Sequence, residues 1–96
     1  MEDMVRAFSA LGNRRRFKIV VSLLESGEVT VGEISRWHRI HQTAASRHLR
    51  KLEIAGLVRG EQRGAYVYYS ADVDSSSLAI RSILGIINRS PKRRVK

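Results

Sequence analysis

The 96-residue chain contains no cysteine and a single proline, and its nine acidic residues are outnumbered by eighteen basic ones. Without cysteine the chain can form no disulfide, thiolate metal site, thiol redox sensor or cysteine nucleophile. Paired carboxylates, a glycine-rich phosphate loop and a Ser/His/Asp arrangement are missing as well, so we expect no enzymatic activity.

Long apolar runs are also missing from the sequence. The apolar clusters are short and interrupted, so we expect no segment that crosses a membrane. The start MEDMVRAF is acidic before it is basic and leads into no unbroken apolar run. We therefore expect no secretory signal and a cytoplasmic protein.

The scarcity of acidic residues leaves a net charge of +9. An excess of this size predicts a polyanionic partner, most often nucleic acid and less often a membrane surface. A generally adhesive basic protein would share the same balance, so charge alone does not identify the partner. With 43% apolar residues, the chain has the composition of a globular protein and the length of one domain.

The first third of the sequence predicts two helices. Apolar residues at helical spacing predict the first from about residue 2 to 11, and Gly12 and Asn13 separate it from the second. The first turn of the second helix carries four cations, which is unfavourable for the helix dipole. We expect this helix to bury one stripe of side chains, formed by Phe17, Val20, Val21 and Leu24.

The next segment predicts a pair of short helices. TVGEIS carries a Thr-x-x-Glu capping box, which predicts a third helix over about 31–38 with Ile34 and Trp37 buried. A short turn, RIHQ, leads into a fourth helix over about 42–55, which ends near Gly56.

After Gly56 the periodicity changes from that of helices to that of strands. LVRGEQRGAYVYYS is rich in β-branched and aromatic residues and predicts a two-stranded hairpin, about 57–61 and 66–70. Asp74 or a neighbouring serine then caps a last helix. The segment RSPKRRVK carries five cations, and we expect residues 89–96 to form a flexible basic tail.

The predicted order is therefore four helices, a β-hairpin and a last helix, a mainly α fold of the α+β class. Two short helices that are joined by a tight turn and followed by a hairpin describe a winged helix-turn-helix. We expect residues 1–88 to form one DNA-binding and dimerisation domain.

The fourth helix has two distinct faces. Ala45, Leu49 and Leu52 fall at i, i+4 and i+7 and are expected to face inward. The opposite face has no acidic residue and carries Thr43, Ser46, Arg47, Arg50 and Lys51. Short hydrogen-bonding groups near the start of a helix and long cations further on fit entry into the major groove, N-terminus first. The alternative is an ordinary solvated face, which usually mixes both signs of charge.

The segments LGNRRRFKIV, TVGEIS, QTAASRHLRKLEIAGLV and RGAYVYYS, in this order, resemble the ArsR/SmtB family of winged-helix repressors. The resemblance covers about residues 6–88, and its most specific parts are the Ser-x-His-Leu of 46–49 and the LEIAGLV that follows. It implies a homodimer built from the first and last helices, a recognition helix at about 42–55, and a wing along the minor groove.

The resemblance also implies which residues bind DNA. Bases and phosphates would be met by Gln42, Thr43, Ser46, Arg47 and His48, and the wing would use Arg59 and Arg63. For His48 the alternative is packing at a helix–helix contact. Arg14 and Arg16 are further candidates for phosphate contact, because they add to the positive field of the chain.

The chain departs from the family at its usual sensor sites. Members that sense metals or arsenite use cysteines in the third helix, or His and acidic pairs in the last helix. Here the third helix reads VGEISRWH, and the last, SSSLAIRSILGII, has no His, Asp or Glu. His38 and His41 could contribute to a metal site only with a third ligand, and phosphate contact or simple exposure is favoured. We therefore predict no metal and no cofactor, and any small-molecule inducer is unknown.

The first and last helices carry wide apolar stripes. A chain of this length is too small to bury them fully, and exposed apolar patches of this kind mark interfaces. We therefore predict a homodimer whose interface contains Met4, Val5, Phe8, Ile80, Ile83, Leu84 and Ile87.

The sequence thus predicts a homodimeric, sequence-specific regulator that binds double-stranded DNA, most simply a repressor that occludes a promoter. One alternative is an abundant, weakly specific protein that coats DNA. Another is a winged helix used as a protein-interaction module.

Overall fold

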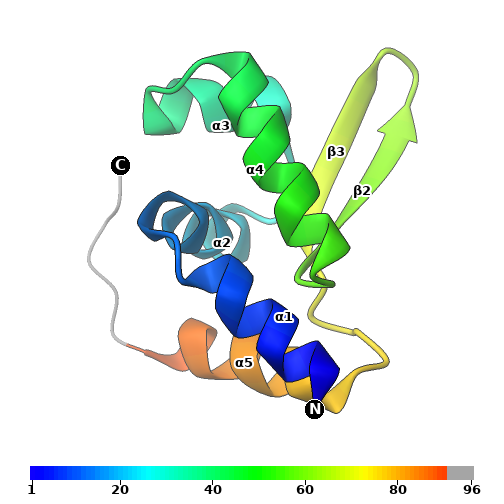
Figure 1. The fold of residues 1–96 in the computed structure, drawn as a ribbon. Helices are drawn as coiled ribbons and strands as arrows, with labels where there is room; N and C mark the ends of the chain where they lie inside the picture. The colour runs from blue at the N-terminus through cyan, green and yellow to red at the C-terminus, as the bar shows by residue number, and fades with distance from the viewer. Residues whose placement is uncertain (91–96) are drawn as a thin grey trace.

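The computed structural model describes residues 1–90, and residues 91–96 lie outside it. Its elements follow in the order α1 (Glu2–Leu11), α2 (Arg14–Ser26), β1 (Val29–Thr30), α3 (Val31–His38), α4 (Gln42–Ile54), β2 (Val58–Arg63), β3 (Tyr66–Ala71) and α5 (Leu78–Arg89). The winged helix-turn-helix predicted from the sequence is confirmed (Figure 1).

Strand β1 is the one element within residues 1–90 that the sequence analysis missed. It pairs antiparallel with β3, Val29 opposite Tyr69 and Thr30 opposite Tyr68, and completes a sheet of order β1-β3-β2. Two residues are too few to show the alternation by which a strand is recognised in a sequence. The strand matters because it fixes the start of α3 to the middle of β3.

The helices divide the molecule into a lower and an upper part in the view of Figure 1. Helices α1 and α5 lie together below, α2 lies behind them in the middle, and α3 and α4 form the upper part. The β2–β3 hairpin projects beside α4 as the wing. No helix within residues 1–90 is both long and apolar enough to cross a membrane.

The inward face predicted for α4 is confirmed. Ala45, Leu49 and Leu52 have no exposed surface, and they join a core that draws on every helix. Each leucine buried in this way contributes about 1.5–3 kcal/mol relative to an exposed position. The opposite face of α4 is therefore held toward solvent.

The stripe predicted for α2 was partly wrong. Val20 and Val21 are buried and Leu24 packs against the core, as predicted. Phe17 is 41% exposed, whereas Ile19 and Leu23 are buried together with Val20. Two stripes of helical spacing overlap in this sequence, and contacts with α1, α4 and α5 decide which one is buried. The buried stripe begins at Arg16, whose side chain is partly enclosed.

Trp37 was also predicted to be buried, and this prediction was wrong. Its side chain is 38% exposed at the end of α3, whereas Ile34 is fully buried. Because α3 has only eight residues, a single apolar side chain, Ile34, is buried in the core. The indole instead forms part of a surface cleft.

The hairpin is longer than predicted, and its loop consists only of Gly64 and Ala65. Gly64 has a φ of 61°, which places a positive φ at the first loop position, as in a type II′ turn. Gly60 lies within β2, where a Cβ would be 2.8 Å from the ring of Tyr69. Because Gly60 has no Cβ, the Tyr69 ring can lie against it while it packs, partly buried, against the core.

Helix α5 is capped by a serine, one of the two options predicted. The Ser77 hydroxyl accepts a hydrogen bond from the Ile80 amide at 3.3 Å. The helix continues through Arg89, the first residue of the predicted basic tail, and most of that tail lies outside the described residues.

The dimer residues predicted on α5 require a correction. Ile80, Ile83, Leu84 and Ile87 are buried by the chain's own helices, so they are not the exposed stripe that the sequence analysis expected. They fill the space between α5, α1 and α2. The exposed apolar side chains of α5 are instead Leu78 and Ile86, at 69% and 58% exposure.

Candidate nucleic-acid interface

The predicted capping box fixes the start of α3. The Thr30 hydroxyl accepts a hydrogen bond from the Glu33 amide at 3.2 Å, and the Glu33 carboxylate accepts one from the Thr30 amide at 2.9 Å. Both bonds satisfy amide groups that a helix start would otherwise leave unpaired. The first turn of α3 is therefore held rigidly next to the sheet.

The turn between α3 and α4 is fixed by Ser35 and Arg39. The Ser35 hydroxyl donates to the Ile40 carbonyl at 2.6 Å, and the Ile40 amide donates to the Ser35 carbonyl at 3.1 Å. Arg39 ends α3 in the left-handed conformation, with a φ of 54°. These features turn the chain sharply, as a helix-turn-helix requires.

Helix α4 starts at Gln42, as predicted, and its cap is His41. The Nδ1 atom of His41 accepts a hydrogen bond from the Thr43 amide at 3.1 Å. The imidazole thus takes the place of the serine-like cap that the family often has. This contact orients the first turn of α4, which carries Gln42 and Thr43 toward solvent.

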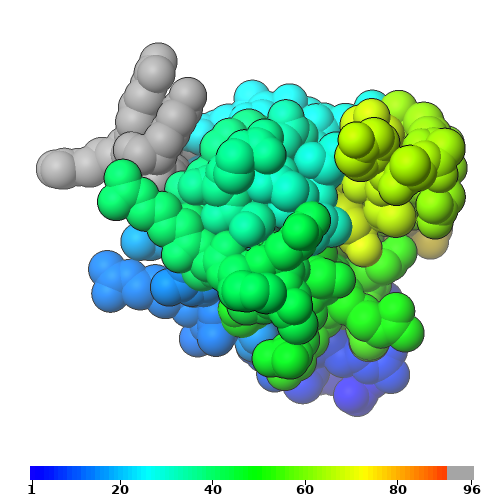
Figure 2. Space-filling model, turned by 90° about the horizontal axis from the view of Figure 1, so that it is seen from above, coloured from blue at the N-terminus to red at the C-terminus, as the bar shows by residue number. Residues whose placement is uncertain are grey.

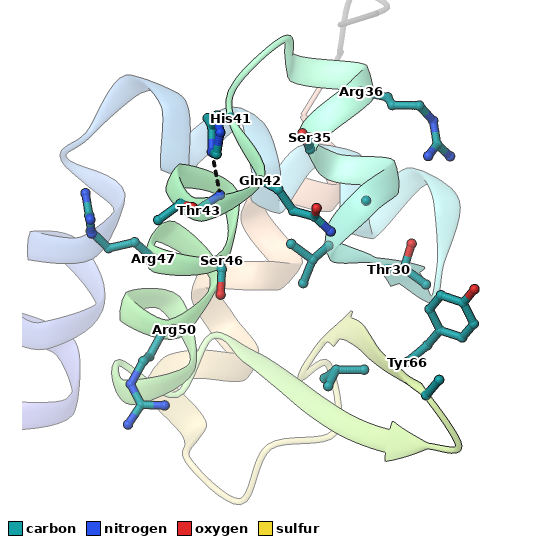
Figure 3. Close-up of a pocket in the computed structure, with 14 residues that line it drawn as sticks. Thr30, Ser35, Arg36, His41, Gln42, Thr43, Ser46, Arg47, Arg50 and Tyr66 are labelled. Carbon is teal, nitrogen blue, oxygen red and sulfur yellow. Dashed lines mark hydrogen bonds between the residues drawn. The ribbon is translucent and has the colours of Figure 1, made fainter.

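An open groove of about 1080 Å³ lies between α3, α4 and the tip of the hairpin (Figure 3). Five of the predicted DNA-binding residues line it, all on the outward face of α4: Gln42, Thr43, Ser46, Arg47 and Arg50. In Figure 3, Gln42 points from α4 toward α3, whereas Arg47 points away from α3. Figure 2 shows the α3–α4 surface and the hairpin from above, on either side of this groove.

The chemistry of the groove is polar and positively charged. Among the described residues that line it there are three arginines and no aspartate or glutamate. Amide and hydroxyl groups near the start of α4 can donate to and accept from base edges, and arginines can pair bidentately with guanine or phosphate. The groove is thus suited to a polyanion with hydrogen-bonding edges.

Several groove residues were not recognised in the sequence. They come from α3 and from the hairpin tip: Gly32, Ser35, Arg36 and Tyr66. Arg36 lies four residues after Gly32, on the face of α3 opposite the buried Ile34, and this spacing could have identified it. Tyr66 joins the groove only because β3 folds back beside α3.

His48 lies on α4 but outside the groove. Its Nδ1 atom is buried and has no hydrogen-bond partner among the described residues. Desolvation, and then the charges of Arg16 and Arg15, lower the pKa of His48 below its usual value. The lowered pKa favours the neutral ring, and Nε2 is the ring nitrogen left for a phosphate contact.

Arg59 and Arg63 of the wing both lie beside carboxylates. Arg59 is 3.8 Å from Asp72, and Arg63 forms ion pairs with Glu28 and Glu61. The guanidinium of Arg63 also lies over the Tyr68 ring, 4.6 Å from its centre. The two glutamates raise the pKa of Arg63, chiefly through the hydrogen bond to Glu28. Much of the charge that the sequence assigns to the wing is thus already compensated.

The other predicted cations lie apart from the groove. Lys51 is exposed further along α4, and Arg14 is exposed at the start of α2. Arg16 is used within the fold, because its Nε donates to the Ala10 carbonyl at 2.8 Å and joins α2 to the end of α1.

His38 has a structural partner. Its Nε2 atom is 2.9 Å from the hydroxyl of the buried Ser22, so the two side chains share a hydrogen bond between α3 and α2. Across residues 1–90 no group of three or more His, Cys, Asp or Glu side chains is arranged to hold a metal ion.

Comparisons with known proteins agree with this geometry. The family model for bacterial regulatory proteins of the arsR family matches residues 13–59, which include α2, α3 and α4. The transcriptional repressor SdpR of Bacillus subtilis is 30% identical over 86 residues, which cover 90% of this chain and 94% of that protein.

Solved structures give the same result. HlyU from Vibrio cholerae superimposes with a TM-score of 0.75 at 31% identity, covering 92% of this chain and 90% of that one. The homodimeric winged helix-turn-helix DNA-binding domain of Mb0332 from Mycobacterium bovis also gives a TM-score of 0.75, at 27% identity, covering 90% of this chain and 75% of that one.

Fold, groove and relatives together define a class of protein, the transcriptional regulators with a DNA-binding winged helix. Within that class, the matching family model and the relatives identify one family. The chain belongs to the arsR family of bacterial regulatory proteins.

Proposed function

We propose that the chain is a homodimeric, sequence-specific repressor that reads double-stranded DNA with α4. The observation that carries this proposal is the groove, where five outward residues of α4 meet α3 and the hairpin tip, and none of the described residues that line it is acidic. Gln42, Thr43, Ser46 and Arg47 would contact base edges, since they lie in the first turns of the helix.

The remaining cations would hold phosphates. Arg50 and Lys51 extend the positive face of α4 toward its end, and Arg14 adds an exposed cation at the start of α2, apart from the groove. Arg59 and Arg63 would follow the backbone near the wing, and their carboxylate partners would have to yield to a phosphate. His48 would contribute through Nε2. Phosphate contacts position the protein and carry little sequence information.

Exposed apolar side chains support dimerisation. On α1, Met4, Val5 and Phe8 are 43%, 53% and 57% exposed, and α5 adds Leu78 and Ile86. Helices α1 and α5 pack together, so one surface can contain both sets. Mb0332, which has the same fold, is homodimeric. A two-fold dimer would place two α4 helices in successive major grooves, about 34 Å apart.

Repression is the direction we propose, because SdpR, a repressor, matches this chain over nearly its whole length. HlyU of Vibrio cholerae, which is 32% identical over 80 residues, is a transcriptional activator. Activation is therefore the alternative that the relatives support.

Selection of bound sites from random DNA, followed by footprinting, tests the proposal. The expected result is a palindromic site whose two half-sites are about one helical turn apart. Recovery of no common sequence would favour a DNA-coating protein, and recovery of no bound DNA at ~50 mM salt would favour a protein-interaction module. Transcription in vitro from a promoter that overlaps the selected site then separates repression from activation.

A further inference from the structure

A second positively charged hollow lies on the other side of the α3–α4 turn from the groove. This α2–α3 cleft has a volume of about 550 Å³ and lies between the start of α2 and the end of α3, which are on the same side of the molecule in Figure 1. Asn13 lies at its edge, and its walls are formed by Arg14, Arg15, Lys18, Trp37, His38 and Arg39.

The cations of the cleft have no carboxylate partners among the described residues. Arg14, Arg15, Lys18 and Arg39 are all exposed, and no acidic side chain lines the cleft. The arginines of the wing, by contrast, are paired with Asp72, Glu28 and Glu61. The arginines of the wing are thus paired with carboxylates, whereas, within residues 1–90, the four cations of the cleft are not.

The cleft is held in shape by bonds between its two walls. Arg15 donates from a guanidinium nitrogen to the His38 carbonyl at 3.1 Å, and His38 is bonded to Ser22 of α2. The charges of Arg15 and Lys18 contribute to the lowered pKa of His38, a sign of positive potential inside the cleft. Four like charges repel one another, and a bound anion would remove that cost.

We propose that the α2–α3 cleft binds a phosphate group and is a site separate from the groove. Guanidinium groups match the oxygens of phosphate in pairs, and a lysine adds a point charge. The half-exposed indole of Trp37 forms one apolar wall, next to which the group that carries the phosphate would lie. The phosphate comes either from DNA that flanks the recognised site, a form that rests on the proposed function, or from a phosphorylated small molecule.

Trp37 is the only tryptophan of the chain, so its fluorescence reports directly on the cleft. The test variant is Lys18→Gln with Arg39→Asn, since asparagine tolerates the left-handed backbone of position 39. The matched control is Arg6→Gln with Arg81→Gln, which removes the same charge from exposed positions outside cleft and groove. Both variants are first shown to keep the native helix content and oligomeric state.

The first arm titrates each protein with inorganic phosphate against chloride at equal ionic strength. If the source is a small molecule, Trp37 emission changes saturably in the native protein and the control, and apparent affinity is at least about tenfold weaker in the cleft variant. The second arm measures binding to a random duplex at several salt concentrations. If the source is flanking DNA, the affinity of the cleft variant depends less steeply on salt concentration. The decrease corresponds to roughly 1–2 fewer phosphate contacts per chain, and the control shows no such decrease.

A cleft variant that matches the control in both arms would overturn the proposal. The second arm uses random DNA, so it tests the cleft even if the chain has no sequence preference. The absence of sequence preference would contradict the proposed function but not the proposed phosphate site. If the chain bound no DNA at all, the phosphate titration alone would decide.

Discussion

Ser46 and Arg47 are neighbours on the outward face of α4, and both line the groove. We expect Ser46→Ala and Arg47→Ala each to lower the preference for the selected site over random DNA by about 1–3 kcal/mol, roughly 5- to 150-fold, because each removes a contact with base edges. Competition titrations with selected and random duplexes measure this preference.

Lys51→Gln is the matched comparison for Arg47. Lys51 is exposed on the same helix but outside the groove, and its loss removes one charge as well. We expect it to weaken binding to all sequences alike. An equal loss of preference in all three variants would contradict the division between residues that read bases and residues that hold phosphates.

The imidazole of His38 makes the free energy of unfolding depend on pH. Burial, and then the charges of Arg15 and Lys18, lower its pKa in the folded state below the ordinary value of 6.5. The unfolded chain therefore binds this proton more readily than the folded one. The contribution of His38 to the free energy of unfolding is therefore fully present above about pH 6.5, and it is lost as the pH falls below that value.

We therefore expect the free energy of unfolding to fall between about pH 7 and pH 5, and to fall less in His38→Gln. Glutamine can keep a hydrogen bond to Ser22 but does not titrate. Urea unfolding at a series of pH values measures both curves. If the two proteins have the same pH dependence, His38 does not titrate differently in the folded and unfolded states.

At the scale of elements, the start of α3 decides how the helix-turn-helix is placed. Thr30→Ala removes the hydroxyl that caps the Glu33 amide, and we expect it to lower the free energy of unfolding by about 0.5–2 kcal/mol. Thr30→Ser keeps the hydroxyl and should recover most of this loss. Urea unfolding measures all three proteins; equal stability of the alanine and serine variants would show that the cap contributes nothing.

Elements with strong local signals could be predicted from the sequence. The capping box at Thr30 and the two faces of α4 depend on residues within one or two turns, and the structure confirms both. The stripe of α2 was predicted only in part, because two stripes overlap and only contacts with neighbouring elements bury Ile19 and leave Phe17 exposed. Strand β1 was missed because its partner, β3, lies about 40 residues further along the chain.

In the candidate site, too, local patterns could be predicted from the sequence, and contacts between distant segments could not. The groove residues of α4 share one helix face, so helical spacing alone brings them together. The ion pair of Arg63 joins it to Glu28, 35 residues away, and the sequence gives no sign that the two side chains meet. The cleft between α2 and α3 escaped notice for the same reason, although its cations were visible in the sequence.

For the whole molecule, the exposed apolar side chains of α1 and α5 predict a dimer. We expect Phe8→Glu to give a monomer by sedimentation, because the carboxylate would have to be buried in the interface. Ile54→Glu is the control, since Ile54 is 70% exposed on α4 and belongs to neither helix. A Phe8→Glu protein that remains dimeric would place the interface elsewhere.

The net charge of +9 guarantees some affinity for any DNA, so binding alone does not establish a regulator. The decisive quantity is the ratio of affinities for the selected site and for random duplex, measured by titration at several salt concentrations. A specific regulator should keep a ratio of at least ~10³ near physiological salt. Equal affinity for the two duplexes at every salt concentration would contradict the account.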